Sequence, residues 1–230
     1  ISSDYLIDSW NNKYHQYHVK RLPNCDSCNR LVCKRITNGG VKINSSRDLC
    51  NLCIKHVVDD KRTIEKMKRD VITILKNVGI KGLPTNIPIH LVSSRNKLEK
   101  LSNIRLGGDI HGYTRYQYDI LNGKKIRENY KIFILSHLHE MVFKAVLAHE
   151  MLHVYIFQND IELPSKELEG FCNLGSELVY ESYNNNFSKI KLMSMYESDD
   201  MDYGYGFREM RSLLDKKGWN GLLTYLSKQD

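Results

Sequence analysis

Four cysteines in two close pairs constrain the N-terminal part of this chain more than any other feature. The pairs are Cys25 with Cys28 and Cys50 with Cys53, each separated by two residues. Such spacing suits four thiolates that converge on one tetrahedral zinc ion, with each pair on a tight turn. Two disulfides are the alternative, but they require an oxidising compartment, and adjacent pairs of this kind make a poor disulfide framework.

The cysteine pattern therefore predicts a structural zinc site in a small zinc-ribbon or half-LIM module over residues 21–56. Gly39-Gly40 predicts a hairpin between short strands inside this module. Such a small module cannot be held together by apolar burial alone, so metal binding is expected to be part of its folding free energy. The remaining cysteines, Cys33 and Cys172, are expected to be ordinary buried thiols.

The chain of 230 residues is long enough for one sizeable core beside such a module. No stretch reaches the roughly 18 to 20 apolar residues that a membrane span requires, so we expect no contact with a membrane. The first residues lack the regions of a signal peptide, which favours a cytoplasmic location. Because the sequence starts with Ile1 rather than Met, secretion of a longer precursor stays open.

The spacing of apolar residues and the turn signals predict the secondary structure. In chain order they predict an N-terminal helix within 1–20, a helix over 59–78, an edge strand over 87–92, a short helix over 94–102, a β-hairpin over 113–135, a helix over 136–157, a helix over 165–183, a polar loop over 184–202, and one or two helices after 206. This order is typical of an α+β fold, in which a small sheet packs against long helices. We expect three parts: the helix in 1–20, the module 21–56 and a main domain over 57–230.

The helix predicted over 136–157 contains His149-Glu150-Met151-Leu152-His153. Two histidines at i and i+4 lie on one helix face, so both imidazoles can reach a single zinc ion. Glu150 lies beside them, where it can accept a proton from a zinc-activated water. The alternative is two histidines on a partly buried helix face. The order of strand, motif helix and second helix favours a zinc peptidase of the zincin type instead.

A catalytic zinc ion needs a third protein ligand. No histidine follows His153, which excludes the metzincin pattern and leaves an acidic ligand from a later segment, the gluzincin arrangement. The candidates are Asp160, Glu162, Glu167, Glu169, Glu177 and Glu181. A helix that crosses behind the first could direct Glu169 to the metal while Asn173, one turn later, orients a histidine.

Three segments together resemble the peptidase domain of the plant DA-one family, which are LIM-type zinc peptidases activated by ubiquitin. They are Leu147–His153, Leu168–Cys172 and Tyr203–Arg208, and the cysteine module, the 87–92 strand and Gly112–Arg115 precede them in the same order. The resemblance implies a zincin-like (gluzincin) endopeptidase domain behind a four-cysteine module. It implies His149, His153 and Glu169 as zinc ligands and Glu150 as the catalytic carboxylate.

The chain departs from the family in two respects. It has no acidic ubiquitin-binding helix and no first half of a LIM domain, so we do not expect dependence on ubiquitin. A compact microbial relative fits this pattern better. The family motif containing Tyr203, Tyr205 and Arg208 either lines the cleft or packs as a turn before the last helix.

The expected reaction is hydrolysis of a peptide bond in a protein or peptide substrate, with one catalytic and one structural Zn²⁺. The residue that stabilises the oxyanion stays open among Tyr180, Tyr203, Tyr205, Arg115 and Arg208. One alternative is a nucleic-acid-associated HExxH protein, which the four-cysteine module and the net charge of +7 would suit. Its usual third histidine is missing, so we do not expect nucleic acid as a partner. The other alternative is a non-catalytic adaptor, which would bind one zinc ion rather than two.

Overall fold

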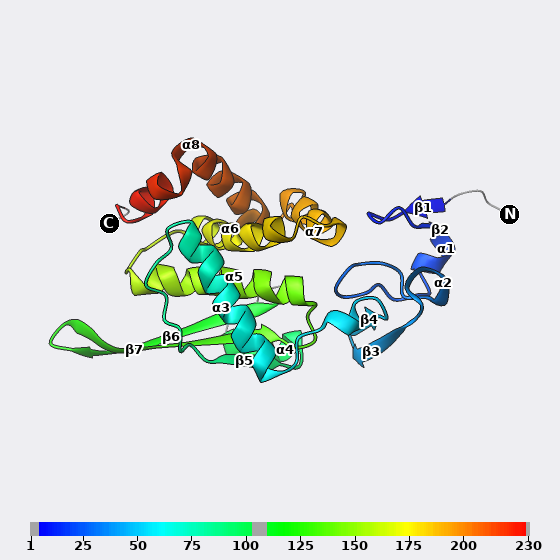
Figure 1. Cartoon of the computed structure of the whole chain (residues 1–230), viewed down its shortest axis with the longest axis horizontal. Helices are drawn as coiled ribbons and strands as arrows, with labels where there is room; N and C mark the ends of the chain where they lie inside the picture. Colours follow the sequence, from blue (N-terminus) through cyan, green and yellow to red (C-terminus); the bar gives the residue numbers. More distant parts are fainter. Residues whose placement is uncertain (1–4, 103–109, 229–230) are drawn as a thin grey trace. The chain divides into compact units, whose positions relative to one another are not determined.

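A computed structural model describes residues 5–102 and 110–228, and it has a mixed α/β fold with small sheets (Figure 1). The chain divides into two compact units. One unit comprises Ile1–Val58 with His137–Val142, and the other comprises Asp59–Ser136 with Phe143–Asp230. Among the described residues, no helix combines the length and the apolar character that crossing a bilayer demands.

The first unit contains short elements arranged around the cysteines. They are β1 (Tyr5–Ile7), β2 (Lys13–His15), α1 (Gln16–Val19), α2 (Lys34–Thr37), β3 (Gly40–Asn44), β4 (Arg47–Cys50) and η1 (Ile54–His56). The helix predicted within 1–20 is wrong, because β1 and β2 form an antiparallel pair and α1 is only four residues long. The Asp8 carboxylate accepts hydrogen bonds from the backbone N–H groups of Trp10 and Asn12, which favour a turn over a helix.

The predicted hairpin in the cysteine module exists, but its turn lies elsewhere. Strands β3 and β4 pair antiparallel and are joined at residues 45–46, where Asn44 Oδ1 accepts a hydrogen bond from the Ser46 N–H. Gly40 instead pairs with Cys50, and a Cβ there would clash with the Leu49 carbonyl and the Val32 side chain. Gly40 therefore permits close packing rather than the turn.

The second unit contains the long helices and a three-stranded sheet. Its elements are α3 (Lys61–Asn77), β5 (Ile89–Val92), α4 (Arg95–Ser102), β6 (Gly112–Leu121), β7 (Lys124–Leu135), α5 (Glu140–Gln158), α6 (Ser165–Tyr183), α7 (Asn186–Tyr196), the π-helix η2 (Met201–Tyr205) and α8 (Gly206–Leu226). Only the first three residues of α5 belong to the first unit. The strand order is β5-β7-β6, with β5 parallel and β6 antiparallel to β7. These findings confirm the edge strand, the hairpin turning at Asn122-Gly123 and the helices predicted over 59–78, 94–102 and 165–183.

Two predictions in this unit are wrong. Ser136 does not begin the motif helix, because its N–H bonds to the Val92 carbonyl and α5 starts only at Glu140. The segment predicted as a polar loop over 184–202 contains α7. A capping box between Asn185 and Ser188 stabilises the start of α7, although its apolar residues show little periodicity.

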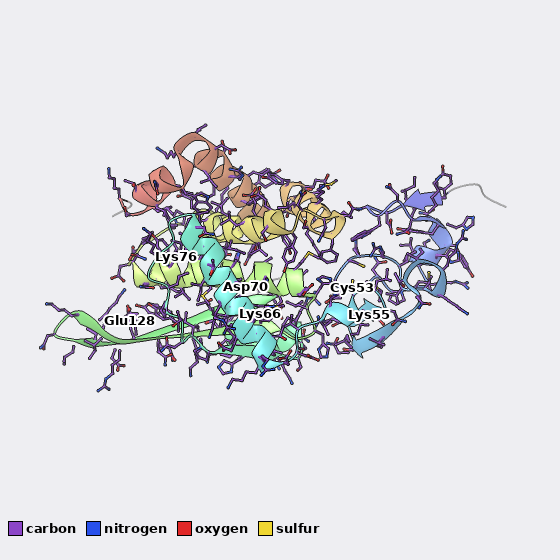
Figure 2. The ribbon with its side chains drawn as sticks, viewed as in Figure 1. Cys53, Lys55, Lys66, Asp70, Lys76 and Glu128 are labelled. Carbon is purple, nitrogen blue, oxygen red and sulfur yellow. The ribbon has the colours of Figure 1, made fainter. Side chains whose placement is uncertain are left out.

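Helix α3 is amphipathic, as its sequence predicts. Its buried face includes Ile64, Val71 and Leu75, whereas Lys66 and Lys76 are exposed (Figure 2). Most basic residues of this helix therefore lie on its solvated face, but Lys68 is buried and its ammonium donates to the Ile87 carbonyl.

Close backbone approaches position the helices that build the candidate site. Helix α5 lies between the sheet and α6 in Figure 1. A Cβ on Gly175 of α6 would lie 3.0 Å from the Ala148 carbonyl of α5. A Cβ on Gly170 would clash with the backbone of Gly206 at the start of α8. Glycine at these positions lets α6 approach both neighbours closely, which brings its polar face near the motif histidines.

Candidate metal centres

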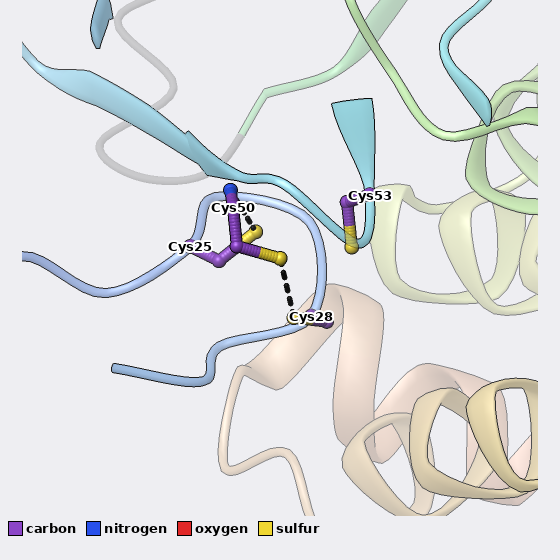
Figure 3. A group of neighbouring side chains, drawn as sticks. All are labelled: Cys25, Cys28, Cys50 and Cys53. Atoms are coloured by element: carbon purple, nitrogen blue, oxygen red, sulfur yellow. Dashed lines mark hydrogen bonds between the residues drawn. The ribbon is translucent and has the colours of Figure 1, made fainter. Parts of the chain in front are cut away.

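The four cysteines of the first unit form one buried group (Figure 3). Their sulfur atoms all lie within 4.8 Å of one another, and Cys28 Sγ lies 3.8 Å from Cys50 Sγ. A tetrahedral ion with bonds of about 2.3 Å separates its sulfur ligands by about 3.8 Å. Neither pair forms a disulfide, since all four thiols are free. The group could hold a metal ion, and its geometry fits zinc.

Backbone hydrogen bonds form the two tight turns that this group requires. The Asn29 N–H donates to the Cys25 carbonyl, and the Cys53 N–H donates to the Cys50 carbonyl. The Cys50 N–H also donates to the sulfur of Cys25 at 3.3 Å. Donation from the other three thiols, Cys28 first, lowers the pKa of Cys25, and the thiolate is the form that binds metals.

A second group of possible ligands lies between α5 and α6. The Nε2 atoms of His149 and His153 are 3.1 Å apart. Glu169 Oε2 lies 3.1 Å from Nε2 of His149 and 3.6 Å from Nε2 of His153. A tetrahedral zinc ion with bonds of 2.0–2.1 Å separates such ligand atoms by about 3.3 Å. The three atoms therefore have the spacing of one face of a zinc tetrahedron.

Glu169 Oε2 supports this interpretation because it is a buried oxygen that lacks a hydrogen bond among the described residues. Such an orphan costs free energy unless an ion occupies its surroundings. Burial alone would raise the pKa of Glu169, but its contacts with His149 and His153 outweigh burial and hold that pKa below its usual range. The carboxylate is thus ionised and available to a cation.

Cys172 is a competing third ligand, since its sulfur also lies within 4.8 Å of ligand nitrogens of both histidines. Its thiol is fully buried, and burial raises its pKa well above the ordinary value. A protonated thiol is a poor metal ligand. Glu169 has a lowered pKa and its Oε2 lies 3.1 Å and 3.6 Å from the two Nε2 atoms, so it is the better candidate for the third ligand.

Asn173 fixes the orientation of the first histidine. Its side-chain nitrogen donates to the Tyr203 carbonyl at 2.9 Å, so Oδ1 is the atom that faces His149. Oδ1 lies 3.0 Å from Nδ1 of His149 and can only accept, which assigns a proton to Nδ1. With the proton on Nδ1, Nε2 is the nitrogen that a neutral His149 ring would offer to a metal ion.

Residues of strand β6 fix the position of the Glu150 carboxylate. The Thr114 hydroxyl in β6 donates to Oε2 of Glu150 at 2.6 Å. Gly112 leaves room for the same carboxylate, because a Cβ there would clash with Oε1 and lie 2.7 Å from Cγ1 of Val146. Burial raises the pKa of Glu150, which makes the carboxylate a stronger base. The sequence did not reveal these roles of Gly112 and Thr114, because they depend on the packing of β6 against α5.

Of the oxyanion candidates, Tyr203 lies at this centre. Its ring stacks on that of His149 with a centroid distance of 6.1 Å, and burial raises its pKa above the ordinary value. Arg208 donates to the Tyr196 and Ser198 carbonyls, and its guanidinium stacks on the Tyr205 ring. Arg208 and Tyr205 therefore contact each other rather than the histidines.

The remaining candidates are engaged elsewhere or lie farther along the same helix. Arg115 donates to the Leu101 carbonyl. Tyr180 is buried two turns after Asn173 in α6, and it lines the cleft beside this centre. Of the other acids, Glu177 accepts from Tyr196 and Arg211. Asp160 pairs with Lys125. Among the described residues, the ion pairs of the two imidazoles are with Glu169 and not with Glu162, Glu167 or Glu181.

A cleft of about 530 Å³ opens beside this centre. His149, Glu150, Asn173 and Tyr203 line it, together with Gly112 at the start of β6. A ligand in the cleft would therefore contact the candidate metal ligand, the buried carboxylate and the tyrosine together.

Comparisons with protein-family models, curated proteins and solved structures find no match to this chain.

Proposed function

We propose that this chain is a zinc-dependent peptidase of the gluzincin type, similar to the DA-one family, and that it cleaves peptide bonds inside proteins or peptides. The observation that supports the proposal most strongly is the convergence of three ligand atoms. Nε2 of His149, Nε2 of His153 and Oε2 of Glu169 lie within 3.1 to 3.6 Å of one another.

His149, His153 and Glu169 would hold the catalytic ion, and Asn173 would keep His149 in the correct tautomer. When bound, zinc supplies Lewis-acid activation of a water nucleophile and of the scissile carbonyl. The four cysteines would hold a second, structural zinc ion whose role is to fold the module around them.

Glu150 acts as the general base. Its carboxylate lies in the cleft beside His149, and Thr114 keeps it in one orientation. It takes a proton from the attacking water and later gives that proton to the leaving amine. Burial raises the pKa of this carboxyl above its ordinary value, which suits a group that must accept and then release a proton.

Tyr203 is the residue that we assign to stabilise the oxyanion. Its hydroxyl stays protonated because burial raises its pKa, so it can donate a hydrogen bond. Its carbonyl holds Asn173 and its ring stacks on His149, so the backbone and side chain of Tyr203 both belong to the site.

The test replaces Glu150 by Gln in zinc-loaded protein. Glu140→Gln is the matched control, because it makes the same chemical change in the same helix at a half-exposed position. We expect Glu150→Gln to keep two zinc ions per chain and to lower the cleavage rate of a quenched fluorescent peptide library at least about 100-fold. Equal cleavage by Glu150→Gln and the wild type would overturn the role of Glu150. A zinc-loaded wild type that cleaves no member of the library would overturn the peptidase proposal.

A further inference from the structure

The cleft extends beyond the metal centre to a region that the proposed chemistry does not use. Helix α5 contributes Val146 there, and α6 contributes Ser176 and Tyr180. Helix α7 contributes Lys191, Ser194 and Met195, which lie at i, i+3 and i+4 and therefore share one helix face. This region is continuous with the part of the cleft that Glu150 lines.

The described lining of the cleft carries three acids, Glu150, Asp200 and Asp202, and one lysine, Lys191. Asp200 Oδ1 accepts the backbone N–H groups of Asp202 and Tyr203, and Asp202 Oδ2 accepts from the Ser165 hydroxyl. Both acids are thus part of the π-helix and its anchoring. Of the described residues that line the cleft, Lys191 is the only Lys or Arg.

Hydroxyl groups line the cleft together with the Lys191 ammonium. Ser194 and Tyr180 line the same cleft as Lys191, and burial raises the pKa of Tyr180, so its phenol stays a neutral donor. An ammonium with hydroxyl donors suits a carboxylate. Val146 and Met195 add apolar surface for the methylene groups that carry such a carboxylate in a side chain.

We propose that this part of the cleft is a specificity pocket that binds an acidic side chain of the substrate, next to the bond that is cleaved. Lys191 is the residue that selects the carboxylate. The proposal rests on the peptidase function proposed above and names its substrate class, which is peptides with Glu or Asp flanking the scissile bond.

The test uses peptide pairs that differ only by Glu against Gln at each position flanking the cleaved bond. We expect zinc-loaded wild type to prefer Glu at one position by about tenfold in kcat/KM, which corresponds to about 1.4 kcal/mol. Lys191→Met should abolish this preference, and Lys191→Glu should reverse it. Lys189→Met is the matched control, because Lys189 lies in the same helix but is exposed and outside the cleft lining, and it should keep the preference.

A binding experiment separates this proposal from the peptidase proposal. The anisotropy of labelled Glu and Gln peptides is titrated with the Glu150→Gln variant and with Glu150→Gln/Lys191→Met. Tighter binding of the Glu peptide that requires Lys191 supports the pocket even if the wild type cleaves nothing. Equal binding and equal cleavage of Glu and Gln peptides would overturn the pocket while leaving the peptidase intact, and so would a preference that survives Lys191→Met.

Discussion

The Nδ1 atom of His149 lies 3.0 Å from Oδ1 of Asn173, across the interface between α5 and α6. The same amide donates to the Tyr203 carbonyl, so one side chain connects the motif helix to the π-helix that follows α7. π-Helical turns often occur at functional sites. Asn173 thus orients His149, a candidate metal ligand that lies 24 residues before it in the sequence.

Replacing Asn173 by Ala should weaken zinc binding without unfolding the protein. The imidazole of His149 would lose the acceptor that fixes its tautomer, and losses of this kind cost about 10- to 100-fold in metal affinity. Asn173→Asp keeps the acceptor toward Nδ1 and should lose less than the Ala variant. Zinc affinity measured by chelator competition checks both variants, and equal affinity of the Ala variant and the wild type would refute this role of Asn173.

Replacing Gly112 by Ala should lower activity while leaving the metal in place. The added Cβ would clash with Oε1 of Glu150, so the carboxylate must shift. A misplacement of about 1 Å can cost 100-fold in rate. We expect a fall of at least tenfold in kcat at unchanged zinc content. Gln117→Ala, on the exposed part of the same strand, is the control and should be neutral.

Local signals in the sequence predicted most of the second unit. The apolar spacing over 59–78 predicted α3, and Asn122-Gly123 forms the turn of the β6–β7 hairpin. The closeness of His149 and His153 follows from helix geometry alone, since i and i+4 lie on one face. Each of these features depends on residues near one another in the sequence.

The features that the sequence did not predict depend on contacts between distant segments. Thr114 and Glu150 are 36 residues apart, so only the packing of β6 on α5 reveals their hydrogen bond. In the N-terminal segment, the spacing of Leu6, Trp10 and Tyr14 indicated a helix, but the side chain of Asp8 binds the backbone in a turn. Helix α7 was missed because its apolar residues show little helical periodicity, although a capping box marks its start.

Replacing Cys50 by Ser should remove one zinc ion per chain and unfold the cysteine module. Structural zinc contributes about 10 to 16 kcal/mol in small zinc-folded peptides, and this module is too small to fold without it. We expect one zinc ion rather than two by elemental analysis and lost hydrogen-exchange protection in residues 25–53. Cys33→Ser is the matched control, because Cys33 is a half-buried cysteine outside the metal group. Retention of two ions by Cys50→Ser would contradict the structural site.

Replacing Thr114 by Val should shift the pH dependence of activity. Burial raises the pKa of Glu150, and the hydrogen bond from Thr114 lowers it by stabilising the ionised form. Loss of that hydrogen bond raises the pKa further. Since the base must be ionised to accept a proton, the acid limb of the kcat/KM profile should move to higher pH. Thr224→Val, at an exposed position in α8, should leave the limb in place, and a shift to lower pH in Thr114→Val would contradict the assignment.

Replacing Tyr203 by Phe separates the chemical role of its hydroxyl from the structural role of its backbone. The Phe variant keeps the carbonyl that binds Asn173 and the ring that stacks on His149, so zinc affinity should stay at the wild-type value. Removing one donor to an oxyanion typically costs about 100- to 1000-fold in kcat, and KM should change little because the donor acts mainly in the transition state. Tyr205→Phe is the matched control, since Tyr205 is 43% exposed and packs against Arg208 rather than the histidines. If both variants keep full activity, the oxyanion must be stabilised by another group. If only Tyr203→Phe loses activity while retaining two zinc ions, the hydroxyl acts in the reaction itself.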